Sequence, residues 1–126
     1  LNIRAIDFAK FGRLILNKGN CDGSQLISED WMNYSFNISE NYKLTEFGDD
    51  LYYRNFWWIY ANKKESDYEI NSIAGTGHLG QYLYIFPKEK IIIVRMGKKD
   101  KNVDSWKTIF QEIVNQIKNN YAHRNI

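Results

Sequence analysis

The residue types best suited to chemistry lie in residues 73–87, IAGTGHLGQYLYIFP. Gly75, Gly77 and Gly80 surround His78, and an apolar run typical of a strand follows at once. Glycine has no Cβ, so the backbone can approach a ligand closely at such a corner. Peptide N–H groups pointing outward there could stabilise an oxyanion, which contributes about 3–4 kcal/mol in a pre-formed site. A β-bulge or close strand packing is the structural alternative, and the pattern alone leaves both open.

No complete catalytic set accompanies this corner. None of the seven serines has a lysine three residues later, so the sequence lacks the Ser-x-x-Lys pair that one helical turn would bring together. His78 and His123 are far apart and Cys21 is the single cysteine, so we predict no metal site, no other cofactor and no internal disulfide. The His78 ring could act as an acid or base, but we expect its peptide N–H to matter more.

The composition is that of one folded domain. The chain has 126 residues, enough for a single hydrophobic core, and its 44% hydrophobic and 16% aromatic residues exclude disorder. The formal net charge of +2 provides no strong field that would attract nucleic acid or an anionic membrane, so we predict no nucleic-acid partner. Because no apolar run reaches about 18 residues, we predict no membrane segment in this chain.

Helical periodicity predicts three helices. The first covers residues 4–17, and the second covers residues 28–36 with Ser28 as its N-cap. The third covers residues 104–120, an apolar stripe for which Asp104 is the expected N-cap.

Strand-like composition predicts four strands, at residues 55–62, 68–74, 81–86 and 91–96. Residues 37–51 are polar and aperiodic, which indicates a surface loop. The last two strands are apolar on both faces, so we expect both faces of the sheet to be covered. The order of elements predicts an α+β fold, an antiparallel β-sheet flanked by helices.

Three segments together resemble the serine β-lactamase-like hydrolases, a family of class C-type β-lactamases, DD-peptidases, and related esterases and amide hydrolases. Residues 3–31 are similar to the family pattern "ta-D-lakfg-ll-n-G-G-li-s-W", and residues 56–60, FWWIY, to its "GyGWw" strand. Residues 74–96 resemble its third active-site strand and the hairpin that follows, "GhxGQ-i-v-P-…-ivV". The order and spacing agree over nearly the whole chain. The resemblance implies the C-terminal portion of the β-lactamase/transpeptidase-like fold.

The resemblance also implies roles for individual residues. The family's Lys-Thr-Gly triplet, His-Thr-Gly in many members, falls on Gly75, Thr76 and Gly77, which keeps the distance to Pro87. The residue that follows the triplet donates its backbone N–H to the oxyanion hole, and here that residue is His78. The second donor would be the N–H of the nucleophilic serine itself. Gly75, Thr76 and Gly77 would thus contact the substrate.

The resemblance also implies a role for Gln81, which would line the acyl pocket together with Thr76. A shifted register would instead match the triplet to His78, Leu79 and Gly80 and make Gln81 the oxyanion donor.

The sequence departs from the family pattern in ways that affect the expected function. A glycine replaces the Lys or His of the triplet at Gly75, which argues against recognition of a β-lactam or peptide carboxylate and favours an esterase or amidase. The family's Ser-x-x-Lys and Tyr-x-Asn motifs lie upstream of where this chain begins, and Tyr60 and Asn62 match the second motif only by chance, inside a strand. We therefore expect residues 1–126 to be a partial domain without its nucleophile, inactive alone.

The resemblance implies a small ester, amide or β-lactam-like substrate for the parent protein and permits its export to the periplasm or cell envelope, although the compartment stays open. A partial domain would leave a sheet edge exposed, through which we expect self-association.

Two alternative functions remain. The chain could be a non-catalytic partner-binding or sensor domain of the same family. It could also be a binding module whose aromatic sheet, with Trp57, Trp58, Tyr82 and Tyr84, stacks a ligand.

Overall fold

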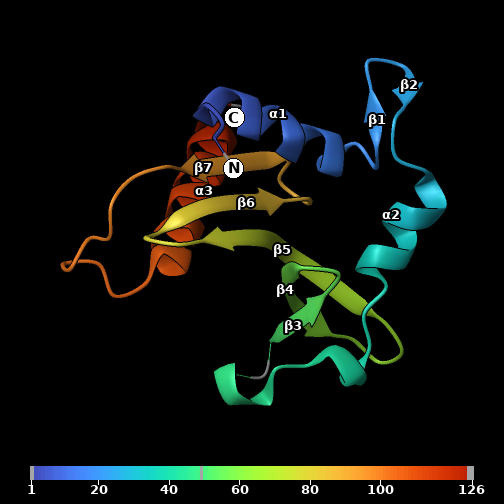
Figure 1. The fold of residues 1–126 in the computed structure, drawn as a ribbon. Helices are drawn as coiled ribbons and strands as arrows, with labels where there is room; N and C mark the ends of the chain where they lie inside the picture. The colour runs from blue at the N-terminus through green and yellow to red at the C-terminus, as the bar shows by residue number, and fades with distance from the viewer. Residues whose placement is uncertain (1, 49, 125–126) are drawn as a thin grey trace.

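The structure, a computed structural model, describes residues 2–48 and 50–124. Its helices are α1 (Ala5–Leu16), α2 (Glu29–Phe36) and α3 (Trp106–Arg124), with short 3-10 helices at Glu40–Tyr42 and Thr45–Phe47. Its strands are β1 (Asn20–Cys21), β2 (Ser24–Gln25), β3 (Leu51–Arg54), β4 (Trp57–Lys63), β5 (Tyr68–Gly77), β6 (Gln81–Phe86) and β7 (Ile91–Arg95). Strands β3 to β7 form one antiparallel sheet in chain order (Figure 1). The predicted α+β class is confirmed.

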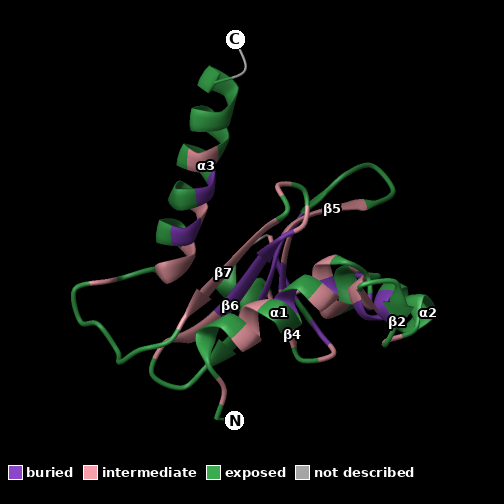
Figure 2. Cartoon of the chain, turned by 90° about the horizontal axis from the view of Figure 1, so that it is seen from above, coloured by how far each residue is buried: buried purple, intermediate pink, exposed green. Residues whose placement is uncertain are grey.

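The two long helices cover opposite faces of this sheet. In Figure 2, α1 and α3 lie on opposite sides of the strands. Ile15 of α1 packs into a cluster with Leu83 of β6, whereas Phe110 and Val114 of α3 pack with Tyr84 on the other face. Successive residues of a strand point to opposite faces, so the run from Tyr82 to Phe86 in β6 presents apolar or aromatic side chains to both layers. The expectation that both faces are covered is therefore confirmed.

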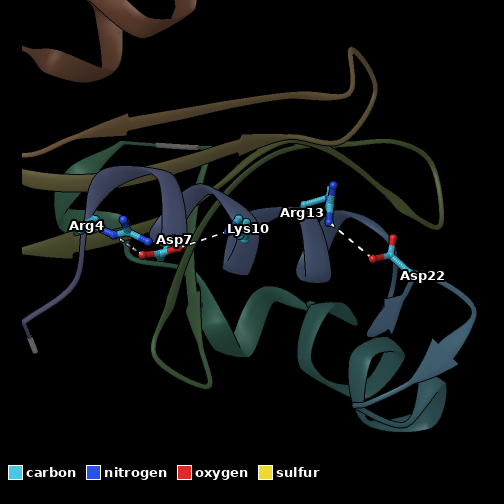
Figure 3. Close-up of polar contacts among 5 residues, drawn as sticks. All are labelled: Arg4, Asp7, Lys10, Arg13 and Asp22. Carbon is cyan, nitrogen blue, oxygen red and sulfur yellow. Dashed lines mark hydrogen bonds and ion pairs between the residues drawn. The ribbon is translucent and has the colours of Figure 1, made fainter.

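Helix α1 keeps its charged residues on its outer surface (Figure 3). Asp7 in the first turn pairs with Arg4 at 2.7 Å and with Lys10 at 3.3 Å, and hydrogen bonds from both hold the pKa of its carboxyl below the usual value. Arg13 reaches Asp22, in the β1–β2 turn, at 4.0 Å. Exposed pairs of this kind contribute little to stability. The attachment of α1 to the sheet therefore depends on its buried side.

Two local expectations were wrong and one was confirmed. Within the expected loop, Leu51 starts strand β3, which pairs with β4 through a turn whose residues Asn55 and Phe56 have positive φ values of 48° and 69°. That turn has no glycine, so the usual hairpin signal was missing. The N-cap of α3 is Ser105 instead of Asp104, because the Ser105 hydroxyl accepts the N–H of the first turn at 3.3 Å. Ser28 caps α2 as predicted.

In the described part of the chain, no helix is both long enough and apolar enough to cross a bilayer.

Candidate functional site

The glycine-rich corner is a tight hairpin turn between β5 and β6. Gly77 pairs directly with Gln81, so only residues 78–80, called the corner turn below, lie outside the strands. Leu79 and Gly80 have φ values of 61° and 84°. Glycine adopts positive φ easily, whereas a leucine rarely does. Strand β5 therefore extends three residues beyond its predicted end and contains two of the three glycines.

Among the described residues, no strand pairs with one edge of the end of β5. The pairing of β4 with β5 ends at Trp58 and Ala74, whereas the pairing of β5 with β6 continues through residues 75–77. Backbone N–H and C=O groups of successive strand residues point alternately to the two edges. Part of the polar backbone of residues 75–77 is therefore directed to the open side, and Thr76, Gly77 and His78 are exposed. This edge could present N–H donors to a ligand.

Close packing explains one of the two strand glycines but not the other. A Cβ built on Gly77 would lie 3.1 Å from the Cβ of Gln81, which is tight. A Cβ on Gly75 would meet only the Trp57 ring, at an ordinary contact distance of 3.8 Å. A larger residue could be accommodated at position 75, so packing does not account for the glycine there.

The corner forms one end of a cavity of about 700 Å³, lined by residues 76–80 and by residues of the 99–107 segment. Tyr60, Tyr82 and Tyr84 form its aromatic wall. Burial, followed by the proximity of Tyr60 and Tyr82, raises the pKa of Tyr84, so its hydroxyl stays protonated. The volume lies within the range of small-molecule sites. This wall is therefore largely aromatic.

The side chain of Gln81 is occupied by backbone. Its Oε1 accepts the N–H of Gly97 at 3.0 Å, and its Nε2 donates to the carbonyl oxygen of the same residue. These two bonds join the start of β6 to the segment after β7. The substrate contact predicted for Gln81 stays a prediction, and a substrate would compete with Gly97 for the amide group.

Sequence reasoning missed Arg95, which supports the corner from the next strand. Its guanidinium donates from Nη1 to the Gly80 carbonyl at 2.6 Å and from Nη2 to the Lys98 carbonyl at 2.7 Å. It also lies 4.1 Å from the centroid of the Trp106 ring, a cation–π contact. The only signal in the sequence was a charged residue that ends the apolar run IIIVR.

The described residues bring the open backbone edge of residues 75–77 close to the tyrosine wall of the cavity, but they provide no activated nucleophile. Within residues 2–48 and 50–124, no three His, Cys, Asp or Glu side chains are grouped so that they could hold a metal ion. Ser105 is the only described serine that lines the cavity, and its hydroxyl caps α3 by accepting the N–H of Thr108. The open edge and the exposed corner turn are accessible to a ligand. A covalent step would need a group from elsewhere.

No family model matches the chain, but it is similar to known hydrolases in sequence and in structure. The chain is 24% identical over 108 residues to the 6-aminohexanoate-dimer hydrolase of Paenarthrobacter ureafaciens. This alignment covers 81% of this chain and 26% of that protein. It also matches the structure of a Bacillus anthracis protein assigned as a 6-aminohexanoate-dimer hydrolase, with a TM-score of 0.70 and 28% identity, over 91% of this chain and 29% of that one.

The chain thus spans less than a third of the length of either relative. Both relatives support a relationship to the β-lactamase-like hydrolases, and the structural match supports the same α+β fold.

Proposed function

We propose that this chain is the C-terminal segment of an active-site-serine hydrolase of the β-lactamase-like family. It supplies the third-motif strand, β5, and one oxyanion-hole donor, the backbone N–H of His78. The similarity to two hydrolases that are each more than three times as long supports this role, as does the lack of Ser-x-x-Lys in the sequence. The nucleophile, its lysine and a tyrosine would come from the rest of the protein.

The observation that carries the proposal is the open edge of residues 75–77 beside the exposed corner turn. Pairing with β6 fixes residues 75–77, and the His78 N–H follows directly after them in the exposed corner turn. A donor attached to a fixed strand needs little reorganisation when charge develops on the substrate, which is the condition for strong electrostatic stabilisation.

In the proposed reaction, the serine oxygen bonds to the carbonyl carbon of the substrate while a basic group takes the hydroxyl proton. The carbonyl oxygen becomes an oxyanion, held by the N–H groups of His78 and of the serine. Collapse of this intermediate releases an alcohol or amine, which takes up the proton, and leaves an acyl-enzyme. Attack of water on the acyl carbon then releases the acid and restores the serine.

The unshifted register fits this role better than the shifted one. It places the triplet on Gly75, Thr76 and Gly77 within β5 and the donor at the first residue of the corner turn. The shifted register would place the triplet on residues 78–80, in the turn itself, where no strand pairing holds the backbone. A strand is what the family resemblance implies for this motif.

We assign the substrate to small esters or amides. Gly75 carries no positive charge that would pair with the carboxylate of a β-lactam. The named substrate of the two relatives, a dimer of 6-aminohexanoate, is joined by an amide. The tyrosine wall of the neighbouring cavity suits an apolar portion of such a molecule.

The decisive experiment separates the N–H of His78 from its ring. It uses the serine-bearing protein that contains this chain. The α-hydroxy acid analogue of histidine at position 78 removes the N–H alone and should lower kcat by about 10²- to 10³-fold. His78→Ala removes the ring, keeps the N–H and should change kcat by only a few-fold. The reverse pattern would show that the ring, and not the amide, is the functional group.

A second experiment uses the isolated chain. We expect no turnover of nitrocefin or p-nitrophenyl esters by residues 1–126 after stringent purification, because the described residues provide no activated nucleophile. Sustained turnover by this chain would contradict the assignment of the nucleophile to another segment.

The second candidate is a non-catalytic binding or sensor domain of the same family. The aromatic cavity wall favours it, because that wall could hold a ligand without any chemistry. A serine-directed fluorophosphonate probe distinguishes the two functions in the longer protein: labelling supports the hydrolase, and ligand binding without labelling supports the sensor.

A further inference from the structure

The conformation of the corner turn is costly for its sequence. Leu79 is a bulky residue with φ of 61°, and half of its side chain is exposed, so little packing compensates for this conformation. A left-handed residue other than glycine costs roughly 1–2 kcal/mol and persists only where its surroundings impose it. Contacts from outside the turn can therefore stabilise residues 78–80 beyond what the pairing of β5 with β6 provides.

Arg95 is placed to do so. Its guanidinium bonds to Gly80, the last residue of the corner turn, at 2.6 Å and to Lys98 at 2.7 Å. The Trp106 ring covers the guanidinium at 4.1 Å. A Cβ built on Gly97 would lie 3.5 Å from both Nη1 and Nη2 of Arg95, so this glycine leaves room for the guanidinium. The guanidinium is therefore held by one turn, one loop and one helix at the same time.

Within the part of the chain that the structure describes, Arg95 has no carboxylate partner. None of the ion pairs among residues 2–48 and 50–124 involves Arg95. Its hydrogen bonds go to carbonyl oxygens, which leave the positive charge uncancelled beside the turn. Lysine cannot reproduce this arrangement, because an ammonium lacks the planar fork that binds two acceptors while stacking on a ring.

We propose that Arg95 is a positioning residue for the oxyanion donor: it sets the corner turn, and so the direction of the His78 N–H, by holding Gly80 against the 97–98 loop and α3. This inference rests on the function proposed above. The Gln81–Gly97 pair supports the same junction from the neighbouring strand. The donor is thus coupled to the segment that joins β7 to α3, which lies far from it in sequence.

The first test measures the turn itself and needs no activity. Amide ¹⁵N relaxation of the isolated chain should give order parameters near the rigid value of about 0.85 for residues 78–80 in the wild type. In Arg95→Lys they should fall toward about 0.6, the flexible limit, while those of Leu83 and Ile85 in the middle of β6 stay unchanged.

Arg54→Lys is the matched control. Arg54 is also an arginine between aromatic rings, 4.2 Å from the Tyr34 centroid and 4.5 Å from that of Tyr42, and it also donates to a backbone carbonyl, that of Asn37. Arg54→Lys should lower the melting temperature without changing the order parameters of residues 78–80. Equal loss of order in the turn and in β6, or the same effect from Arg54→Lys, would overturn the proposal.

The second test measures catalysis by the longer protein. Arg95→Ala should lower kcat by about tenfold or more with little change in KM, in line with the loss of hydrogen bonds to a charged group. Guanidinium ion at millimolar concentration should restore part of that loss, and sodium at the same ionic strength should not. Unchanged kcat, or a loss that guanidinium does not reverse, would overturn the positioning role. An ordered wild-type turn in a protein with no hydrolytic activity would instead contradict the proposed function.

Discussion

Gly12 of α1 lies so close to Leu83 of β6 that a Cβ built on the glycine would be 3.0 Å from Cδ1 of the leucine. The same Cβ would lie 3.0 Å from Cγ2 of Ile92 in β7. Helix α1 therefore approaches the sheet so closely that a Cβ at position 12 would require the Leu83 and Ile92 side chains to shift. Gly12 is buried, although glycine is a poor helix former, which indicates that close packing outweighs helix propensity at this position.

Gly12→Ala should therefore destabilise the protein despite its better helix propensity. Overpacking costs about 1–3 kcal/mol, which exceeds the propensity gain of about 1 kcal/mol. Urea denaturation should show a lower midpoint with an unchanged slope. An unchanged or higher midpoint would mean that α1 can move away from β6 at no cost.

Gly80→Ala should destabilise more than Gly23→Ala. Both glycines have left-handed φ values, 84° and 93°, so both substitutions carry a backbone cost of about 1–2 kcal/mol. The new Cβ at Gly80 would also lie 2.9 Å from Nη1 of Arg95, whereas nothing lies within 4 Å at Gly23.

The difference between the two alanine variants should therefore disappear in an Arg95→Ala background, which a double-mutant cycle in thermal unfolding can measure. If the difference persists without Arg95, the contact with the guanidinium is not its cause.

The isolated chain should self-associate through β7. This strand is at one edge of the sheet and consists of apolar residues up to Arg95, and Ile109 and Ile113 on α3 are also exposed. An apolar edge strand is a template for pairing with a second copy. Ile91→Lys, at the first residue of β7, should weaken association in sedimentation velocity runs across a concentration series. Leu26→Lys adds the same charge to an exposed leucine outside this sheet and should not.

The pH dependence of stability should report Glu69. Hydrogen bonds from Lys88 and then Lys64 hold the pKa of this carboxyl below its usual 4.5, and Glu69 in turn raises the pKa of Lys88 above 10.5. The carboxyl contribution is present above about pH 4.5 and is lost as the pH falls through the lowered pKa. The lysine contribution is present below about pH 10.5 and is lost as the pH rises through the raised pKa.

Glu69→Gln should therefore lower the melting temperature most between about pH 5 and pH 10, and the difference should shrink at both ends. The groups are exposed, so the effect should be small and should decrease with added salt. A difference that is constant from pH 3 to pH 7 would assign the effect to packing instead of charge.

Short-range patterns predicted much of the fold. The apolar periodicity of α1 and α3, the Ser28 cap and the strand-like runs of β4 to β7 each depend on residues within a few positions of one another, and all are present in the structure. Strand β3 was missed because it is four residues long and its turn uses Asn55 and Phe56 instead of a glycine. The side-chain contacts of Gln81 could not be predicted, because its partner Gly97 lies sixteen residues away.

The sequence by itself determined the α+β order of elements and the glycine-rich corner in residues 73–87, because periodicity and glycine content are local properties of the chain. Only the tertiary structure decided that β4 stops pairing at Ala74 and leaves residues 75–77 open on one edge. The tertiary structure also brought the Arg95 guanidinium into hydrogen-bonding contact with the carbonyl oxygen of Gly80, fifteen residues earlier in the chain. Both features depend on strand register and hairpin closure, which are set by packing of the whole sheet between α1 and α3 and are not encoded at any single position.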